Sequence, residues 1–193
     1  VGDAVYKGDV VQTQGNSELG VTFTDGTTFN LTSNARMVLN EFVYSPGGSA
    51  NSALINLVQG SISFIAGEVA HTGDMRIGTP AATMGIRGTM VQVDIDVNNG
   101  QIKLAVLVEP NGLTGSFNVY SLDGQLLGIV NDASITALVT PQGPLQASFS
   151  QVFKSPAELQ DALSIVQKVV QTQSVGAAKP FTVDVRVIAA TNH

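Results

Sequence analysis

Short runs of alternating apolar and polar residues, separated by turn residues, constrain the fold of this chain more than any other feature. Between Asp9 and Thr32 the residues alternate, and Asp25-Gly26 stands between two such runs, which is a pattern typical of a β-hairpin. The apolar positions favour Val, Ile, Leu, Phe and Thr, which suit strands, and Gly, Asn and Asp separate the runs. An all-β fold is therefore predicted.

The pattern continues to the C-terminal end. The predicted strands are 37–39, 42–44, 54–58, 61–65, 74–77, 83–86, 90–97, 101–109, 116–121, 125–130, 134–139, 146–152 and 181–188, and 45–51 is expected to be an exposed loop. Short strands at near-regular spacing favour an antiparallel β-sandwich or jelly-roll-like fold. A β-solenoid is the alternative, because Gly and Asn turns also suit stacked coils and periodicity does not separate the two.

One helix is predicted near the C-terminus, at about 155–174. Ser155 is a suitable N-cap, Pro156 suits the first helical position, and Glu158 completes a capping box. An apolar stripe with helical spacing is expected to pack on the sheet, and it comprises Leu159, Leu163, Val166, Val169 and Val170.

A soft boundary is placed near residues 98–100, where Asn98-Asn-Gly100 predicts a turn. Residues 1–97 would form one β-domain. Residues 98–193 would form either a β-rich extension of the same sheets or a small second domain.

Composition excludes several classes of protein. The 193 residues carry a net charge of −6 and no run of Lys or Arg that could neutralise several phosphates, so nucleic acid is not an expected partner. No apolar run approaches the roughly 18 residues that span a bilayer. The chain has no cysteine, which excludes disulfides, thiolate metal sites and cysteine nucleophiles. Since it lacks signal-peptide features and an initiating Met, it is expected to be a mature or excised segment.

The segment 76–89, RIGTPAATMGIRGT, concentrates Gly, Thr, Pro and two arginines, and its candidate residues are Thr79, Arg87 and Thr89. In a functional interpretation Arg87 clamps an anion or carboxylate, and Thr89 and the neighbouring glycines let backbone amides approach the ligand. In the structural interpretation, which is favoured, Gly85 and Gly88 mark close strand approach or bulges, and Arg87 pairs with a carboxylate such as Asp94 or Asp96 to fasten strands.

No catalytic or metal site is organised in the sequence, so an enzyme, a cofactor and a metal are not expected. The segment after Asp94 resembles a calcium loop, but its twelfth position is Ala105 and its sixth is Asn99. His71, expected in a turn at 69–73, has no accompanying hydrolase motif. Glu41 and Glu68 could pair as in a glycosidase, but nothing in the sequence places them together.

Several of these motifs, in this order, resemble the FecR domain family over roughly residues 1–97. They are Gly8-Asp9 followed by Thr13, Asp25-Gly26, Gly60 closing a middle strand, and Thr79-Pro80 leading to Arg87-Gly88-Thr89. The resemblance implies a β-rich extracytoplasmic domain of a bacterial protein, of a kind that relays a signal from an outer-membrane transporter or occurs in large secreted and surface proteins.

The expected function is a non-catalytic extracytoplasmic interaction or structural module of a larger surface or envelope protein, whose partner is a protein or a cell-surface component. The alternative is a periplasmic signal-relay domain of a FecR-type regulator. A carbohydrate-active enzyme is less favoured.

Overall fold

The computed structural model describes residues 4–177 and 185–192, and these residues form fourteen strands and two helices. The elements are β1 (Val10–Gln12), β2 (Ser17–Phe23), β3 (Thr28–Leu31), β4 (Arg36–Val43), β5 (Ser52–Ile65), α1 (Glu68–Thr72), β6 (Asp74–Gly78), β7 (Thr83–Arg87), β8 (Met90–Ile95), β9 (Ile102–Leu107), β10 (Ser116–Tyr120), β11 (Leu126–Val130), β12 (Ile135–Pro141), β13 (Ala147–Phe153), α2 (Pro156–Ala177) and β14 (Val185–Asn192). The predicted hairpin at Asp25-Gly26 joins β2 and β3.

The long strand β5 joins two layers of sheet. Its first part pairs with β4 and β6, and its last part pairs with β3 and β8. The change of partners occurs at Gly60, whose φ is +80° and whose position a Cβ could not occupy, because it would lie 2.6 Å from the Cα of Ala35. The two strands predicted at 54–58 and 61–65 are therefore one bent strand, and Gly60 lies inside it rather than closing it.

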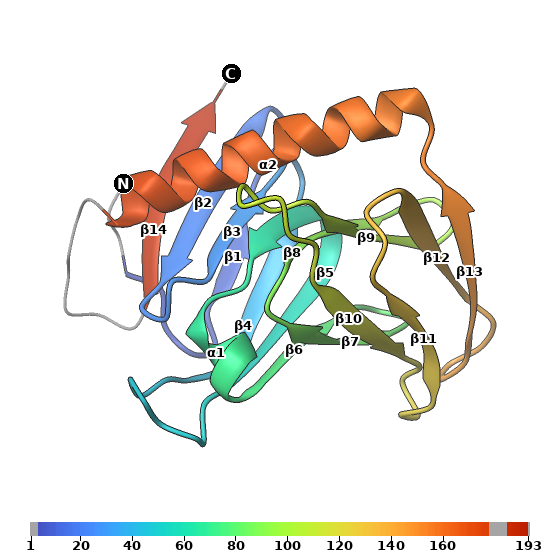
Figure 1. The fold of residues 1–193 in the computed structure, drawn as a ribbon, viewed down its shortest axis with the longest axis horizontal. Coiled ribbons are helices and arrows are strands. Elements are labelled where there is room, and N and C mark those ends of the chain that lie inside the picture. The colour runs from blue at the N-terminus through green and yellow to red at the C-terminus, as the bar shows by residue number, and fades with distance from the viewer. Residues whose placement is uncertain (1–3, 178–184, 193) are drawn as a thin grey trace.

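The two layers face each other across the core (Figure 1). One layer has the order β14-β2-β3-β5-β8-β9-β12-β13 and will be called layer A; the other, layer B, has the order β1-β4-β5-β6-β7-β10-β11. Every neighbouring pair is antiparallel except β5 and β6. The prediction of an all-β fold with one long C-terminal helix is confirmed. The solenoid alternative is wrong, because stacked coils would pair successive strands in parallel.

The layers nearly close into a barrel where β11 and β13, the end strands of the path, approach each other. The Gln151 side-chain amide donates to the carbonyl of Ile129 at 2.9 Å. The Phe149 ring lies over Gly128, where an added Cβ would come within 2.4 Å of the ring. Side chains therefore bridge a seam that backbone pairing leaves open.

Strands from both halves of the sequence pair directly. The turn predicted at 98–100 separates β8 from β9, which are partners in layer A, and β10 pairs with β7 in layer B. Side chains alternate between the two faces of layer A along each strand. In β8, Val91, Val93 and Ile95 point into the core, whereas Met90 points to the other face.

Helix α2 lies across the outer face of layer A (Figure 1). Its capping box is confirmed, since the Ser155 amide and hydroxyl donate to the Glu158 carboxylate at 2.7 and 2.8 Å. The predicted apolar stripe is partly wrong: Leu159 and Leu163 are exposed. The packed face is rotated from it and comprises Ala162, Ile165, Val166, Val169 and Val170. Neither described helix is long and apolar enough to cross a membrane.

The structure also bears on the turn predicted at 69–73 and the strand predicted at 181–188. Residues 69–72 of the turn predicted at 69–73 belong to the short helix α1, and Gly73 is its C-cap. The last predicted strand, 181–188, lies partly outside the described residues, and its described part belongs to β14, which pairs with β2.

Candidate functional site

The segment 76–89 forms most of β6, the turn that follows it, and β7. Thr79 holds the turn: its backbone N–H and its hydroxyl donate to the carbonyl of Ala82 at 2.9 and 2.7 Å, and its hydroxyl oxygen accepts from the Ala82 N–H at 3.1 Å. Since Thr79 is buried, the contacts of its side chain lie inside the fold.

Thr89 is also a buried residue with contacts inside the fold. Its carbonyl accepts from the Ala66 N–H at 3.0 Å, and its side chain packs so closely on Gly115 that an added Cβ there would lie 2.5 Å from the Cβ of Thr89. This close approach occurs at Gly115, outside the segment, whereas an added Cβ at Gly85 would lie 3.5 Å from the Tyr120 ring.

Arg87 differs from both threonines, because its side chain is exposed and makes no ion pair or hydrogen bond within the described part of the chain. The expected pairing with Asp94 or Asp96 is wrong. Asp94 lies on β8 in layer A, in register with Lys103 of β9, whereas Arg87 lies in layer B, in register with Ser116. The two strands are neighbours in sequence but belong to different layers.

Around Arg87 the outer face of layer B is hollowed into a cavity of about 600 Å³, which we call the layer B hollow. Its floor is the row in which Gly85 of β7 stands between Arg76 of β6 and Asn118 of β10. Because Gly85 has no side chain, the row is low at its centre. The lining also includes His71, Asp74, Arg87 and Tyr120.

The charges of the layer B hollow are unevenly compensated. Arg76 contacts the Asp74 carboxylate through Nε at 3.1 Å and Nη2 at 2.9 Å, and this hydrogen-bonded carboxylate raises the pKa of Arg76 above its usual value. Arg87 has no such carboxylate among the described residues. One cation is therefore neutralised and the other is available.

The uncharged side chains of Asn118 and Tyr120 and the imidazole of His71 complete the lining of the hollow. The Asn118 amide donates to the Tyr120 hydroxyl at 3.0 Å. From α1, the His71 ring lies directly on Gly88, where an added Cβ would be 1.9 Å from Cε1. Gly88 has a φ of +50°, so its missing side chain admits both the backbone conformation and the ring.

The arrangement is suited to recognition by ionic contacts and hydrogen bonds. No three His, Asp or Glu side chains converge as a metal site within residues 4–177. Glu41, considered for a glycosidase, accepts from the Ser52 hydroxyl at 2.6 Å, and neither it nor Glu68 lines the layer B hollow.

Sequence reasoning identified Arg87 but missed His71, Asp74, Asn118 and Tyr120 as its neighbours. The Gly88 position carried a signal for a close contact, but not for which ring makes it. Asn118 and Tyr120 lie about thirty residues further along the chain and join the face only because β10 pairs with β7.

Comparisons with known proteins give a family and a fold. The FecR family, described as FecR protein, matches residues 9–108. No curated protein matches. Among solved structures, two from Parabacteroides distasonis that carry the name anti-sigma factor are similar to this chain. The first has a TM-score of 0.57 at 12% identity over 80% of this chain, and the second 0.58 at 11% over 95%.

The chain spans 64% of the first of these structures, which is less than two thirds, and 84% of the second. Identities this low establish a shared fold. The family match covers more than half of the 193 residues and includes the motifs that carried the resemblance from Asp9 onward. This chain belongs to the FecR family.

Proposed function

We propose that this chain is a non-enzymatic signal-relay domain that acts outside the cytoplasm by binding a protein partner through the layer B hollow. Membership of the FecR family supports a regulatory role, and so does the fold shared with two structures named anti-sigma factors. These comparisons favour the relay domain, the alternative from the sequence, over a structural module of a surface protein.

The observation that carries the proposal is the position of Arg87. It lies within the family region, on a hollowed face, with an exposed guanidinium that no described carboxylate neutralises. A guanidinium offers several donors in a fixed fork that matches a carboxylate. Arg and Tyr are also enriched among the residues that dominate protein interfaces. A partner loop that presents an acidic side chain to Arg87 beside Tyr120 fits this face.

Site-specific photo-crosslinking in the native host tests the proposal. A photoreactive amino acid would replace Tyr120 in the full-length protein, and a matched protein would carry it at exposed Lys7, outside the hollow. We expect position 120 to capture a discrete protein, in an extracytoplasmic fraction, that position 7 does not capture. Equal capture at both positions, or none at position 120, would contradict the proposal.

A further inference from the structure

A second surface, on the opposite layer, carries a row of polar side chains that the relay proposal does not use. On the outer face of layer A, Asn30 of β3 lies in register with Ser63 of β5, and Ser63 with Gln92 of β8. The row continues to Ala105 of β9, and Thr136 of β12 follows it, next to the pair of Ala137 with Leu104. Since neighbouring strands lie about 4.8 Å apart, the four steps from Asn30 to Thr136 span roughly 19 Å.

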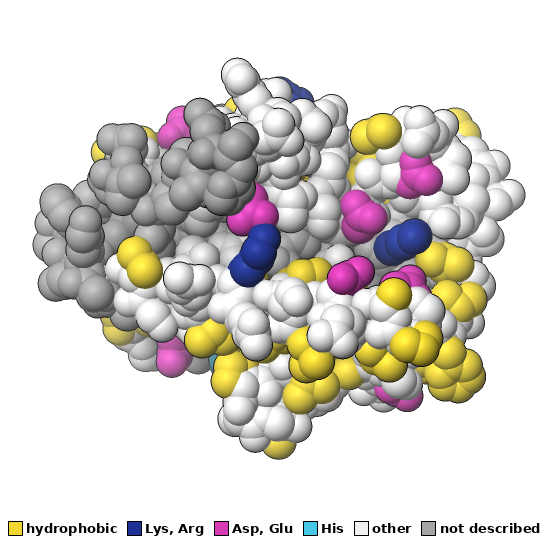
Figure 2. Space-filling model, turned by 90° about the horizontal axis from the view of Figure 1, so that it is seen from above, with side chains coloured by type: hydrophobic (Ala, Val, Ile, Leu, Met, Phe, Trp, Pro, Cys, Tyr) yellow, Lys and Arg dark blue, Asp and Glu magenta, His cyan; other side chains and the backbone are white. Residues whose placement is uncertain are grey.

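Helix α2 forms a wall along this row. The helix residues that face the row recur at helical spacing, and they include Glu158, Asp161, Ser164, Lys168 and Gln171. Two cavities of about 530 and 140 Å³ lie between helix and sheet, and both are lined by Gln92 and Asp161. The two cavities share these lining residues, and together we call them the α2 cleft. Figure 2, viewed from the side of α2, shows acidic and basic side chains gathered around the hollows of this face.

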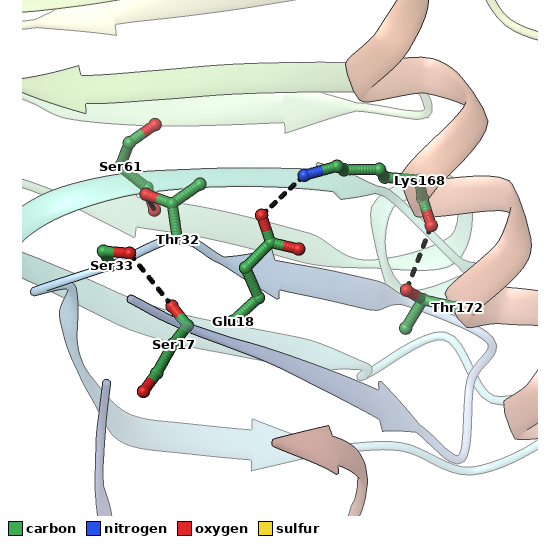
Figure 3. A network of polar contacts seen from close by, with 7 residues as sticks. All are labelled: Ser17, Glu18, Thr32, Ser33, Ser61, Lys168 and Thr172. Carbon is green, nitrogen blue, oxygen red and sulfur yellow. Dashed lines mark hydrogen bonds and ion pairs between the residues drawn. The ribbon is translucent and has the colours of Figure 1, made fainter. Parts of the chain in front are cut away.

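The wall is held in place at the end near β2. The Lys168 ammonium forms an ion pair with the Glu18 carboxylate at 2.5 Å. The backbone carbonyl of Lys168 accepts a hydrogen bond from the Thr172 hydroxyl at 3.0 Å (Figure 3). The methyl group of Thr172 lies over Gly20, where an added Cβ would be only 2.4 Å away. Val169 packs in an apolar cluster with Met90 and Leu107. These contacts fix the helix beside the row instead of on top of it.

Several polar groups that line the α2 cleft have no partner inside the described fold. Ser63 and Thr136 are each only 6% exposed, and their hydroxyls make no hydrogen bond there; the side-chain amides of Asn30 and Gln92 make none either. No fully buried polar side-chain atom among the described residues lacks a partner, so these unpartnered groups are open to the cleft and can bond to a ligand there.

The charges of the cleft leave the exposed carboxylate of Asp161, near the middle of the cleft, without an ion pair among the described residues. Lys168 is paired with Glu18, Lys154 donates to the carbonyls of Val106 and Ala133, and Glu158 caps the helix. Asp161 is exposed and makes no ion pair among the described residues.

Asp94 and Lys103 line the same end of the cleft. Burial raises the pKa of Asp94, whereas the charge of Lys103 acts in the opposite direction. Two lysines and three carboxylates line the smaller cavity, namely Lys103, Lys154, Asp94, Glu158 and Asp161.

We propose that the α2 cleft binds an extended peptide segment that carries a lysine or arginine side chain, which Asp161 recognises. Amide and hydroxyl side chains both donate and accept, as the amides of a peptide backbone require. At about 3.3 Å per residue, an extended chain of six residues matches the length of the row. None of the cleft residues is aromatic, which disfavours a sugar ligand that would stack on a ring.

The probe is an acetylated and amidated hexapeptide, Ser-Ala-Lys-Ala-Ser-Ala, titrated into the isotope-labelled 193-residue chain and followed by amide chemical shifts. A version with Glu in place of Lys and a chitin trisaccharide are run in parallel. We expect saturable shifts at Asn30, Ser63 and Gln92 with the lysine peptide and at least tenfold weaker binding of the glutamate peptide.

Two variants separate recognition from folding. Asp161→Asn removes the charge at nearly constant size and is expected to abolish the tenfold preference, whereas Glu68→Gln on α1 makes the same charge change away from the cleft and is expected to keep it. Ser63→Ala is expected to weaken peptide binding without lowering the melting temperature, because that hydroxyl has no partner in the fold.

Binding of the trisaccharide but not of either peptide would overturn the proposal, and so would the absence of peptide-induced shifts at millimolar concentration. Failure of the peptide to bind the α2 cleft would not contradict the partner-binding proposal for the layer B hollow, since the two surfaces share no lining residue.

Discussion

Asp25 shows how a single residue joins distant parts of the fold. Its buried carboxylate accepts from the Thr27 N–H at 2.9 Å, the Thr27 hydroxyl at 2.7 Å and the Val69 N–H at 3.1 Å, so it fastens the β2–β3 turn to the start of α1. Replacement by alanine leaves buried donors without partners, and such donors cost about 1–3 kcal/mol each.

We therefore expect Asp25→Ala to lower the free energy of unfolding by about 2–4 kcal/mol, measured by urea denaturation. Glu68→Gln, which removes an exposed carboxylate nearby, is the control and is expected to stay close to the wild type. Equal midpoints for the two variants would contradict this role of Asp25.

The same residue marks how far the sequence could predict a site. Asp25-Gly26 predicted a hairpin, because turn chemistry is local, but not the capping of a helix more than forty residues away. Likewise the glycines of 76–89 predicted a close approach of strands or bulges, whereas the ring that packs on Gly88 comes from α1, and the surroundings of Arg87 depend on which strand becomes the neighbour of β7.

At the scale of elements, Gly60 allows β5 to serve both layers. We expect Gly60→Ala to cost at least about 3 kcal/mol, because a Cβ would meet the backbone of Ala35 in addition to the strain of a left-handed residue. Gly124→Ala is the matched control: its φ is +90° but nothing lies within 4 Å, so only about 1–2 kcal/mol of backbone strain is expected. Thermal unfolding that ranked the variants in the opposite order would contradict the account.

The start of α2 is expected to depend on pH. Hydrogen bonds from the backbone and hydroxyl of Ser155 lower the pKa of Glu158. Ionised Glu158 therefore stabilises the cap above the ordinary glutamate pKa of about 4.3, and this stabilisation is lost as the pH falls through the lower folded-state pKa.

Amide exchange at Glu158 and Leu159, corrected for intrinsic rates, should reveal fraying of the first turn as the pH falls through this window. Glu158→Gln removes the titrating group and should abolish this pH dependence. Persistence of the same pH dependence in that variant would show that another group causes it.

Elements were predictable where their signals are local. The capping box located the start of α2 correctly, and alternation located most strands. The buried face of α2 was not predictable, because Leu159 and Leu163 have the same spacing as the residues that do pack, and only the sheet beneath decides between the two faces. In β5, Gly60 looked like an end because a glycine inside a strand pattern more often marks an interruption.

At the scale of the whole molecule, pairing between distant segments determines both surfaces that bear on function. The parallel pairing of β5 with β6 and the pairing of β7 with β10 build the layer B hollow, while β3, β5 and β8 align the floor of the α2 cleft. Neither surface follows from periodicity. The family resemblance predicted membership of the FecR family correctly, and it rested on turns and close approaches that position these strands.

The central claim is that Arg87 serves recognition and not folding. The most direct measurement compares Arg87→Glu with Lys7→Glu in two assays, thermal unfolding and affinity for the partner captured from position 120. We predict that both variants have the melting temperature of the wild type. Only Arg87→Glu is predicted to lose at least tenfold in partner affinity, as expected for an interface arginine. Unfolding of Arg87→Glu alone, or an equal loss of affinity in both variants, would contradict the claim.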